Sequence, residues 1–135
     1  AGSLGRRLLL HATAVMHGGE ELPCVREDAS VAEALVEMSR KRLGMTAIAA
    51  ADGRLAGIFT DGDLRRALDR GIDVRQARIA EVMTRNPRTI DAGQMATEAA
   101  HLMERHRING LIVVDAEQRP VGALNVHDLL RARVV

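Results

Sequence analysis

The stretch GIFTDGDLRRA, residues 57–67, returns later in the chain as GALNVHDLLRA, residues 122–132. Each stretch begins with an apolar run too short for a helix and continues into a charged segment with helical spacing. We interpret each as a buried strand that leads directly into an amphipathic helix. The same strand-to-helix junction thus occurs twice, and this indicates a fold built from a duplicated unit.

The duplication extends well beyond the junction. A shift of 65 positions aligns Val25–Ala67 with Ile90–Ala132 without a gap, and the pair Val15-Met16 matches Val82-Met83 at a shift of 67. The first copy therefore has a loop two residues longer. We predict two copies of one unit of about 60 residues, which stack because a single copy cannot cover its own apolar face.

Each copy is predicted to have the order β-α-β-β-α, and the fold class is α+β. Ser30 with Glu33 is typical of a helix N-terminus, and this helix is expected to end at Gly44, its counterpart at Asn109. Short apolar runs predict strands, and periodic charged runs predict a second helix in each copy. The predicted strands are Leu22–Val25, Met45–Ala51 and Leu55–Phe59, then Arg88–Ile90, Leu111–Val114 and Val121–Leu124; the second helices are Asp61–Arg70 and Val126–Arg133.

Composition excludes several classes of protein. Of 135 residues, 47% are hydrophobic and 27% charged, which is typical of a globular domain and excludes disorder. Phe59 is the only aromatic residue, so a stacking platform for single-stranded nucleic acid cannot be assembled. The balance of 19 basic and 18 acidic residues does not favour duplex binding. The apolar runs are far shorter than the roughly 20 residues of a membrane span.

Two further features concern the origin of the chain. The single Cys24 cannot form an internal disulfide, so a cytoplasmic location is expected. The chain begins at Ala1 without an initiator Met, and we interpret it as a processed chain or a fragment of a longer protein.

The junction has two interpretations. Thr60 and Asp63, or Asn125 and Asp128, can simply cap a helix. The same groups also suit a nucleotide, because the N–H groups of a first helical turn attract a phosphate and a carboxylate accepts two hydrogen bonds from ribose hydroxyls. Repetition does not separate the two, since a duplicated cap would repeat as well.

The two units, which open with Val15-Met16-His17 and Val82-Met83-Thr84 and close with the junction, resemble a tandem pair of cystathionine-β-synthase (CBS) domains. More narrowly, the start at residues 4–9 and the run 57–66 resemble the C-terminal regulatory region of bacterial D-arabinose-5-phosphate isomerases, which feed synthesis of the lipopolysaccharide sugar Kdo. The resemblance implies a linker over residues 1–14 after a sugar-isomerase domain, a first unit over 15–72 and a second over 73–135.

The resemblance also implies a regulatory, non-catalytic chain that binds a nucleotide between the units and requires no cofactor. An adenine nucleotide is expected by similarity to CBS pairs, and CMP-Kdo is a second candidate as feedback signal of the pathway. Thr60 and Asp63 match the family pattern fully, whereas Asn125 replaces the hydroxyl of the second unit. The implied site residues are Thr60, Asp61, Asp63, Arg65, Met45 and Thr46 in the first unit, and Asn109, Asn125, His127 and Asp128 in the second, with Arg131 as a further source of charge.

The expected partners are the isomerase domain in cis and a second copy of the chain, with neither nucleic acid nor membrane. Apolar helix faces that a second copy would cover include Ala67, Leu68, Leu129 and Ala132.

Other possibilities differ in class. A structural dimerisation module without ligand is the main alternative, and an enzyme would have to use Asp61, Asp63, His127 and Asp128 as one cluster. An EF-hand at Asp61 fails because position twelve is Ile72, and His101 and His106 lack the spacing of a zinc pair.

Overall fold

The computed structural model describes residue 5 and residues 9–135. The linker predicted over residues 1–14 lies partly outside these residues, at positions 1–4 and 6–8. The elements are α2 (Ala12–Val15), β1 (His17–Gly18), η1 (Gly19–Glu21), β2 (Cys24–Arg26), α3 (Val31–Lys41), β3 (Met45–Ala49), β4 (Leu55–Thr60), α4 (Asp61–Asp69), α5 (Ile79–Val82), β5 (Thr84–Arg85), β6 (Thr89–Asp91), α6 (Ala96–His106), β7 (Gly110–Val114), β8 (Pro120–Asn125) and α7 (Val126–Arg131).

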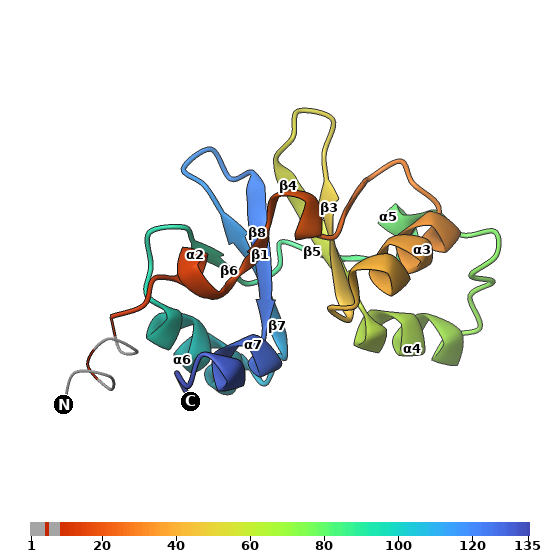
Figure 1. The fold of residues 1–135 in the computed structure, drawn as a ribbon. Coiled ribbons are helices and arrows are strands. Elements are labelled where there is room, and N and C mark those ends of the chain that lie inside the picture. The colour runs from red at the N-terminus through yellow and green to blue at the C-terminus, as the bar shows by residue number, and fades with distance from the viewer. Residues whose placement is uncertain (1–4, 6–8) are drawn as a thin grey trace.

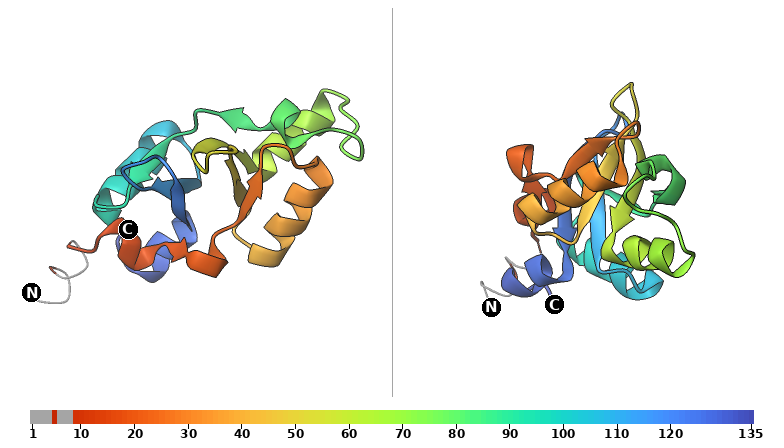
Figure 2. Two further views of the ribbon diagram at one scale, coloured as in Figure 1. Left: turned by 90° about the horizontal axis from the view of Figure 1, so that it is seen from above. Right: turned by 90° about the vertical axis from the view of Figure 1, so that its right-hand side faces the viewer.

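The predicted β-α-β-β-α order appears in both copies, as β2-α3-β3-β4-α4 and β6-α6-β7-β8-α7. In each copy the first strand pairs parallel with the second and the second pairs antiparallel with the third. Helices cover the outer face of each sheet, and the two sheets lie side by side in the middle of the molecule (Figures 1 and 2). The α+β class and the duplicated unit are confirmed.

The two sheets pack against each other along an apolar seam, and a pseudo-two-fold axis at this seam relates the two units. Alternate residues of β3, β4, β7 and β8 point into this seam, as the period of two in a strand requires. The equivalent positions 45 and 110 meet there, because a Cβ added at Gly110 would lie 2.7 Å from Met45. The buried residues of the seam are Met45, Ala47, Ile58, Ile112, Val114 and Ala123.

The short strands ahead of β2 and β6 are exchanged between the sheets. β1 belongs to the first half of the chain but pairs antiparallel with β8 of the second. β5 belongs to the second half but pairs antiparallel with β4 of the first. Each sheet therefore contains a strand from the other half of the chain, and the predicted boundary between residues 72 and 73 stays a prediction.

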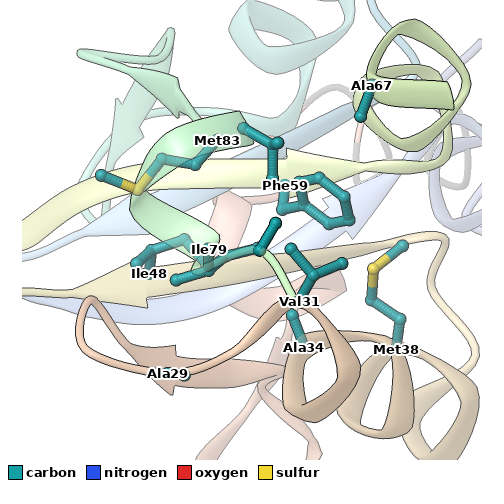
Figure 3. Close-up of a cluster of buried hydrophobic side chains, with 11 residues drawn as sticks. Ala29, Val31, Ala34, Met38, Ile48, Phe59, Ala67, Ile79 and Met83 are labelled. Carbon is teal, nitrogen blue, oxygen red and sulfur yellow. The ribbon is translucent and has the colours of Figure 1, made fainter. Parts of the chain in front are cut away.

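The exchanged segments also fill the cores. Ile79, the first residue of α5, and Met83, which follows this helix, pack on Phe59 of β4 and Val31 of α3 (Figure 3). On the other side, Ala12 of α2 is fully buried against α6 and its N–H donates to the Gln94 carbonyl. The part of the predicted linker that the structure describes thus contributes to the core of the second unit.

Some predicted details were wrong. α3 and α6 end three residues earlier than expected, because Arg42 and Arg107 adopt the left-handed conformation that terminates a helix. Ala67 and Leu129 are buried in the cores of their own units and offer no surface to a second copy, whereas Leu68 and Leu130 are about half exposed. In the described part of the chain, no helix is long and apolar enough to cross a membrane.

Candidate functional site

The first junction is a complete capping box. The Thr60 hydroxyl accepts from the N–H of Asp63 at 3.2 Å, and Oδ2 of Asp63 accepts from the N–H of Thr60 at 3.0 Å. Thr60 is extended and ends β4, so the chain turns into α4 without a loop. The helix cap, one of the two interpretations of this spacing, is thus present, and the nucleotide interpretation stays a prediction.

The second carboxylate oxygen of Asp63 is also occupied. Oδ1 accepts from the Arg66 guanidinium at 2.7 Å and from the Thr84 hydroxyl at 2.8 Å. The Asp63 side chain is 5% exposed, and these donors satisfy a charge that would otherwise be costly to bury. Thr84 comes from the exchanged strand β5, so Asp63 ties that strand to the helix of the first unit.

The second junction repeats this arrangement. Asn125 and Asp128 exchange the two capping hydrogen bonds, at 3.0 Å and 2.8 Å. Oδ1 of Asp128 accepts from the Arg131 guanidinium and from Nε2 of His17, the latter at 2.7 Å. His17 lies in β1, so it occupies the position that Thr84 has in the first junction.

Two glycines allow the exchanged strands to pass. A Cβ at Gly57 would lie 2.6 Å from the Thr84 carbonyl oxygen, and one at Gly122 would collide with the Met16 side chain. At Gly57 the close neighbour is the backbone of β5, which is typical of a glycine within a strand, whereas at Gly122 it is the Met16 side chain just before β1. The spacing of Gly57 and Asp63, which the repeat shares, is thus explained by one exchanged strand. This strand packs on the glycine and donates a hydrogen bond to the aspartate.

Two arginines of α4 surround the first junction. Arg66 pairs with Asp63, and Arg65 is exposed on the helix, so its predicted contact with a ligand stays a prediction. A Cβ at Gly62 would lie 3.3 Å from the Arg66 guanidinium, so this cation borders the backbone of the first turn. The N–H of Asp61 donates to the Gly44 carbonyl at 3.2 Å and that of Asp63 to Thr60, which leaves Gly62 as the place in this turn for an anion to approach.

The remaining predicted site residues lie in different surroundings. Met45 is buried in the seam, and the buried Thr46 hydroxyl donates to the Ala47 carbonyl at 3.1 Å. Asn109 is exposed and lines a shallow hollow of about 370 Å³ between α6 and α7, and its carbonyl accepts from Val126. His127 is exposed in the first turn of α7.

Sequence reasoning missed three residues that hold the junctions: Arg66, Thr84 and His17. Arg66 and Arg131 are equivalent in the repeat and lie three residues after an aspartate, which is a helical ion-pair spacing. Thr84 and His17 both follow a Val-Met pair. The sequence shows the repeated Val-Met pair, but only the strand exchange shows that the residue after each pair lies in the opposite sheet.

A further polar cluster belongs to the first unit alone. Glu37 accepts from the Cys24 N–H and from Lys41, and Lys41 also donates to the Leu22 carbonyl at 3.2 Å. Burial raises the pKa of Glu37, but the hydrogen bonds from Cys24 and Lys41 and the charges of Lys41 and Arg40 outweigh it and lower that pKa overall. Burial and the Glu37 charge raise the pKa of the Cys24 thiol. The cluster attaches β2 to α3.

The family model for the CBS domain matches residues 14–70 and 79–135. The chain belongs to the CBS domain family. It carries two such domains in tandem, as the repeat predicted.

Curated relatives are arabinose 5-phosphate isomerases. The protein named KdsD of Pseudomonas aeruginosa is 60% identical over 134 residues, which are 99% of this chain and 41% of that protein. KdsD of Escherichia coli K12 is 48% identical over 134 residues, 40% of its length. The chain therefore spans about two fifths of the length of these relatives.

Solved structures share the fold. The CBS domain pair of protein MJ0100, in complex with 5′-methylthioadenosine and S-adenosyl-L-methionine, has a TM-score of 0.77 and 26% identity over 90% of this chain and 97% of that one. Hypoxic Response Protein I, which holds two coordinated zinc ions, has a TM-score of 0.76 and 29% identity over 90% of this chain and 97% of that one. In the described part of this chain, no three His, Cys, Asp or Glu side chains cluster to hold a metal.

Proposed function

We propose that this CBS pair is a regulatory module that binds a nucleotide at the junction of β4 and α4. The observation that carries the proposal is the buried carboxylate of Asp63 beside Thr60 and Arg66, in a fold that it shares with a CBS pair complexed with adenosine compounds. A carboxylate can accept both hydroxyls of a ribose, and a guanidinium next to a helix N-terminus attracts a phosphate.

The existing contacts define how a ligand would enter. Oδ2 of Asp63 is held by the backbone of Thr60, whereas Oδ1 faces the side chains of Arg66 and Thr84. These two side chains are exposed, so ribose hydroxyls would compete for Oδ1 by displacing them. Arg66, once displaced, remains beside Gly62 and meets the phosphate.

We further propose that the chain is the regulatory part of an arabinose 5-phosphate isomerase in the cytoplasm. The support is 60% identity to two fifths of such an enzyme. The isomerase domain would then lie in the same polypeptide, and the chain alone has no isomerase activity. Besides adenine nucleotides, CMP-Kdo is a candidate ligand, because it brings a ribose, a phosphate and a carboxylate to a site bordered by arginines.

Titration calorimetry with AMP, S-adenosylmethionine and CMP-Kdo tests the proposal. Asp63→Asn removes the charge with little change in shape, and we expect it to weaken binding by roughly 2 kcal/mol or more, since hydrogen bonds to charged groups are worth about 1.5 to 3 kcal/mol. Asp69→Asn, an exposed position on the same helix, is the matched control and should bind as the wild type does. Equal affinity in both variants would contradict the assignment of Asp63.

A structural module for dimerisation is the second candidate. It is favoured by the complete internal pairing of Asp63 and Asp128, and by the exposed Leu68 and Leu130 on the last helix of each unit. A thermal-shift assay with nucleotides distinguishes the candidates, because a purely structural module forms a dimer in sedimentation velocity yet shows no thermal shift with any nucleotide.

A further inference from the structure

The two buried aspartates are held by different residues of the exchanged strands. Oδ1 of Asp63 accepts from the Thr84 hydroxyl, whereas Oδ1 of Asp128 accepts from Nε2 of the His17 ring. We infer that His17 is a latch that keeps the Asp128 junction closed, so that the Asp63 junction alone takes the ligand. This inference rests on the proposed nucleotide binding and adds which of two similar carboxylates serves it.

The His17 ring is held from both sides. Nε2 lies 2.7 Å from Oδ1 of Asp128, and Nδ1 lies 3.4 Å from Oε1 of Glu21. Its backbone is in β1, paired with Ala123 of β8. An imidazole donates along a fixed direction in its ring plane, so a ribose hydroxyl that takes over Oδ1 must push the whole ring away from two carboxylates.

Thr84 presents a much smaller obstacle. It is exposed, and its hydroxyl can rotate to donate to water or to accept a hydrogen bond from a ribose hydroxyl. Displacement of this hydroxyl from Asp63 exchanges one hydrogen bond for another and moves no ring. The first junction therefore yields to a ligand more easily than the second.

An independent difference lies in the first turn of the two helices. The second helical position is Gly62 in α4 and His127 in α7. A Cβ added at Gly62 would lie 3.3 Å from the Arg66 guanidinium, so this cation borders a backbone segment that carries no side chain. At position 127 an exposed imidazole occupies the corresponding place. A phosphate thus has room beside Thr60 and meets a side chain beside Asn125.

The number of ligands bound per chain tests the latch. With AMP and with CMP-Kdo in separate titrations, we expect one ligand per wild-type chain, about thirtyfold or more weaker binding in Asp63→Asn, and affinity within about twofold of wild type in Asp128→Asn. His17→Thr combined with His127→Gly, which gives the second junction both residue types of the first, should add a second ligand, whereas His127→Gly alone should not. Two ligands on the wild type, or equal losses in the two asparagine variants, would overturn the inference.

A measurement without ligand separates this inference from the proposed function. Because His17 anchors β1, His17→Ala should speed hydrogen exchange of the β1 amides by about tenfold, and Thr84→Ala should change those of β5 less. If neither ligand binds any variant, nucleotide binding fails and the assignment of Asp63 fails with it. Unchanged exchange in His17→Ala shows that His17 is no latch, whatever binds.

Discussion

Glu37 shows how pairing can outweigh burial at one carboxyl group. Its side chain is 13% exposed, yet its pKa is lowered, because the Cys24 N–H and the Lys41 ammonium both favour the charged form. A carboxyl group whose pKa falls on folding stabilises the native state above its unfolded pKa, about 4.3 for Glu, and this contribution is lost as the pH falls through the folded pKa.

Glu37→Gln tests this balance. At pH 7 we expect the free energy of unfolding to fall by about 1 to 2 kcal/mol, the range of a hydrogen bond to a charged group. The difference from wild type should shrink as the pH falls below the unfolded pKa of Glu, about 4.3, because the unfolded wild-type chain then binds a proton more readily than the folded one. Urea unfolding between pH 7 and pH 3 measures it, with the exposed Glu104→Gln as control. A difference that stays constant with pH contradicts the assigned pKa shift.

The same substitution affects Cys24. Burial and the Glu37 charge together raise the thiol pKa, so little reactive thiolate is present at neutral pH. Glu37→Gln removes one of these two causes, and the rate of reaction with a disulfide reagent at pH 7 should increase while the protein stays folded. An unchanged or slower rate shows that burial alone protects the thiol.

At the residue scale, the sequence predicted hydrogen bonds between residues close in the chain but not those between residues far apart in it. The spacing of Thr60 and Asp63 predicted their mutual hydrogen bonds, since both lie within one helical turn. Nothing local points from Asp63 to Thr84 or from Asp128 to His17, because these pairs are 21 and 111 residues apart.

At the scale of elements, the order of strands and helices along each unit was predictable from the sequence, and the exchange of β1 and β5 was not. Hydrophobic period, turn residues and helix caps show where strands and helices lie, whichever partner a strand pairs with. A two-residue strand carries almost no pattern, and its partner depends on how the two sheets pack. The one local indication of the exchange was a glycine inside a strand. Gly57 lies against the backbone of β5, and Gly122 lies against the Met16 side chain just before β1.

Gly57→Ala tests the crossing. The added methyl group meets the Thr84 carbonyl, which belongs to a paired strand, so β5 must shift and we expect a loss of about 1 to 3 kcal/mol in the free energy of unfolding. Gly93→Ala is the matched control, because nothing lies within 4 Å of its Cβ. Equal stability of the two variants in urea would falsify the close approach of β5 to β4.

At the scale of the whole molecule, the exchange joins the two units more firmly than the seam alone. Ile79, Val82 and Met83, from the start of the second half of the chain, are buried in the core of the first unit. Ala12, from the segment before the first unit, is buried in the core of the second. Neither core is complete without residues from the other half of the chain, so we expect the two units to unfold together.

Urea unfolding should accordingly show one transition for both sheets. Ile79→Val removes one buried methyl group from the first core, and we expect it to lower the free energy of unfolding by about 0.5 to 1.5 kcal/mol. Amide signals of β3 and of β7 should shift to the same lower midpoint, which far-UV circular dichroism should reproduce, because the sheets unfold together. Val36→Ala on the exposed face of α3 is the control and should leave both midpoints within error. If β3 loses stability while β7 keeps the wild-type midpoint, the two units fold independently and the exchanged strands do not couple them.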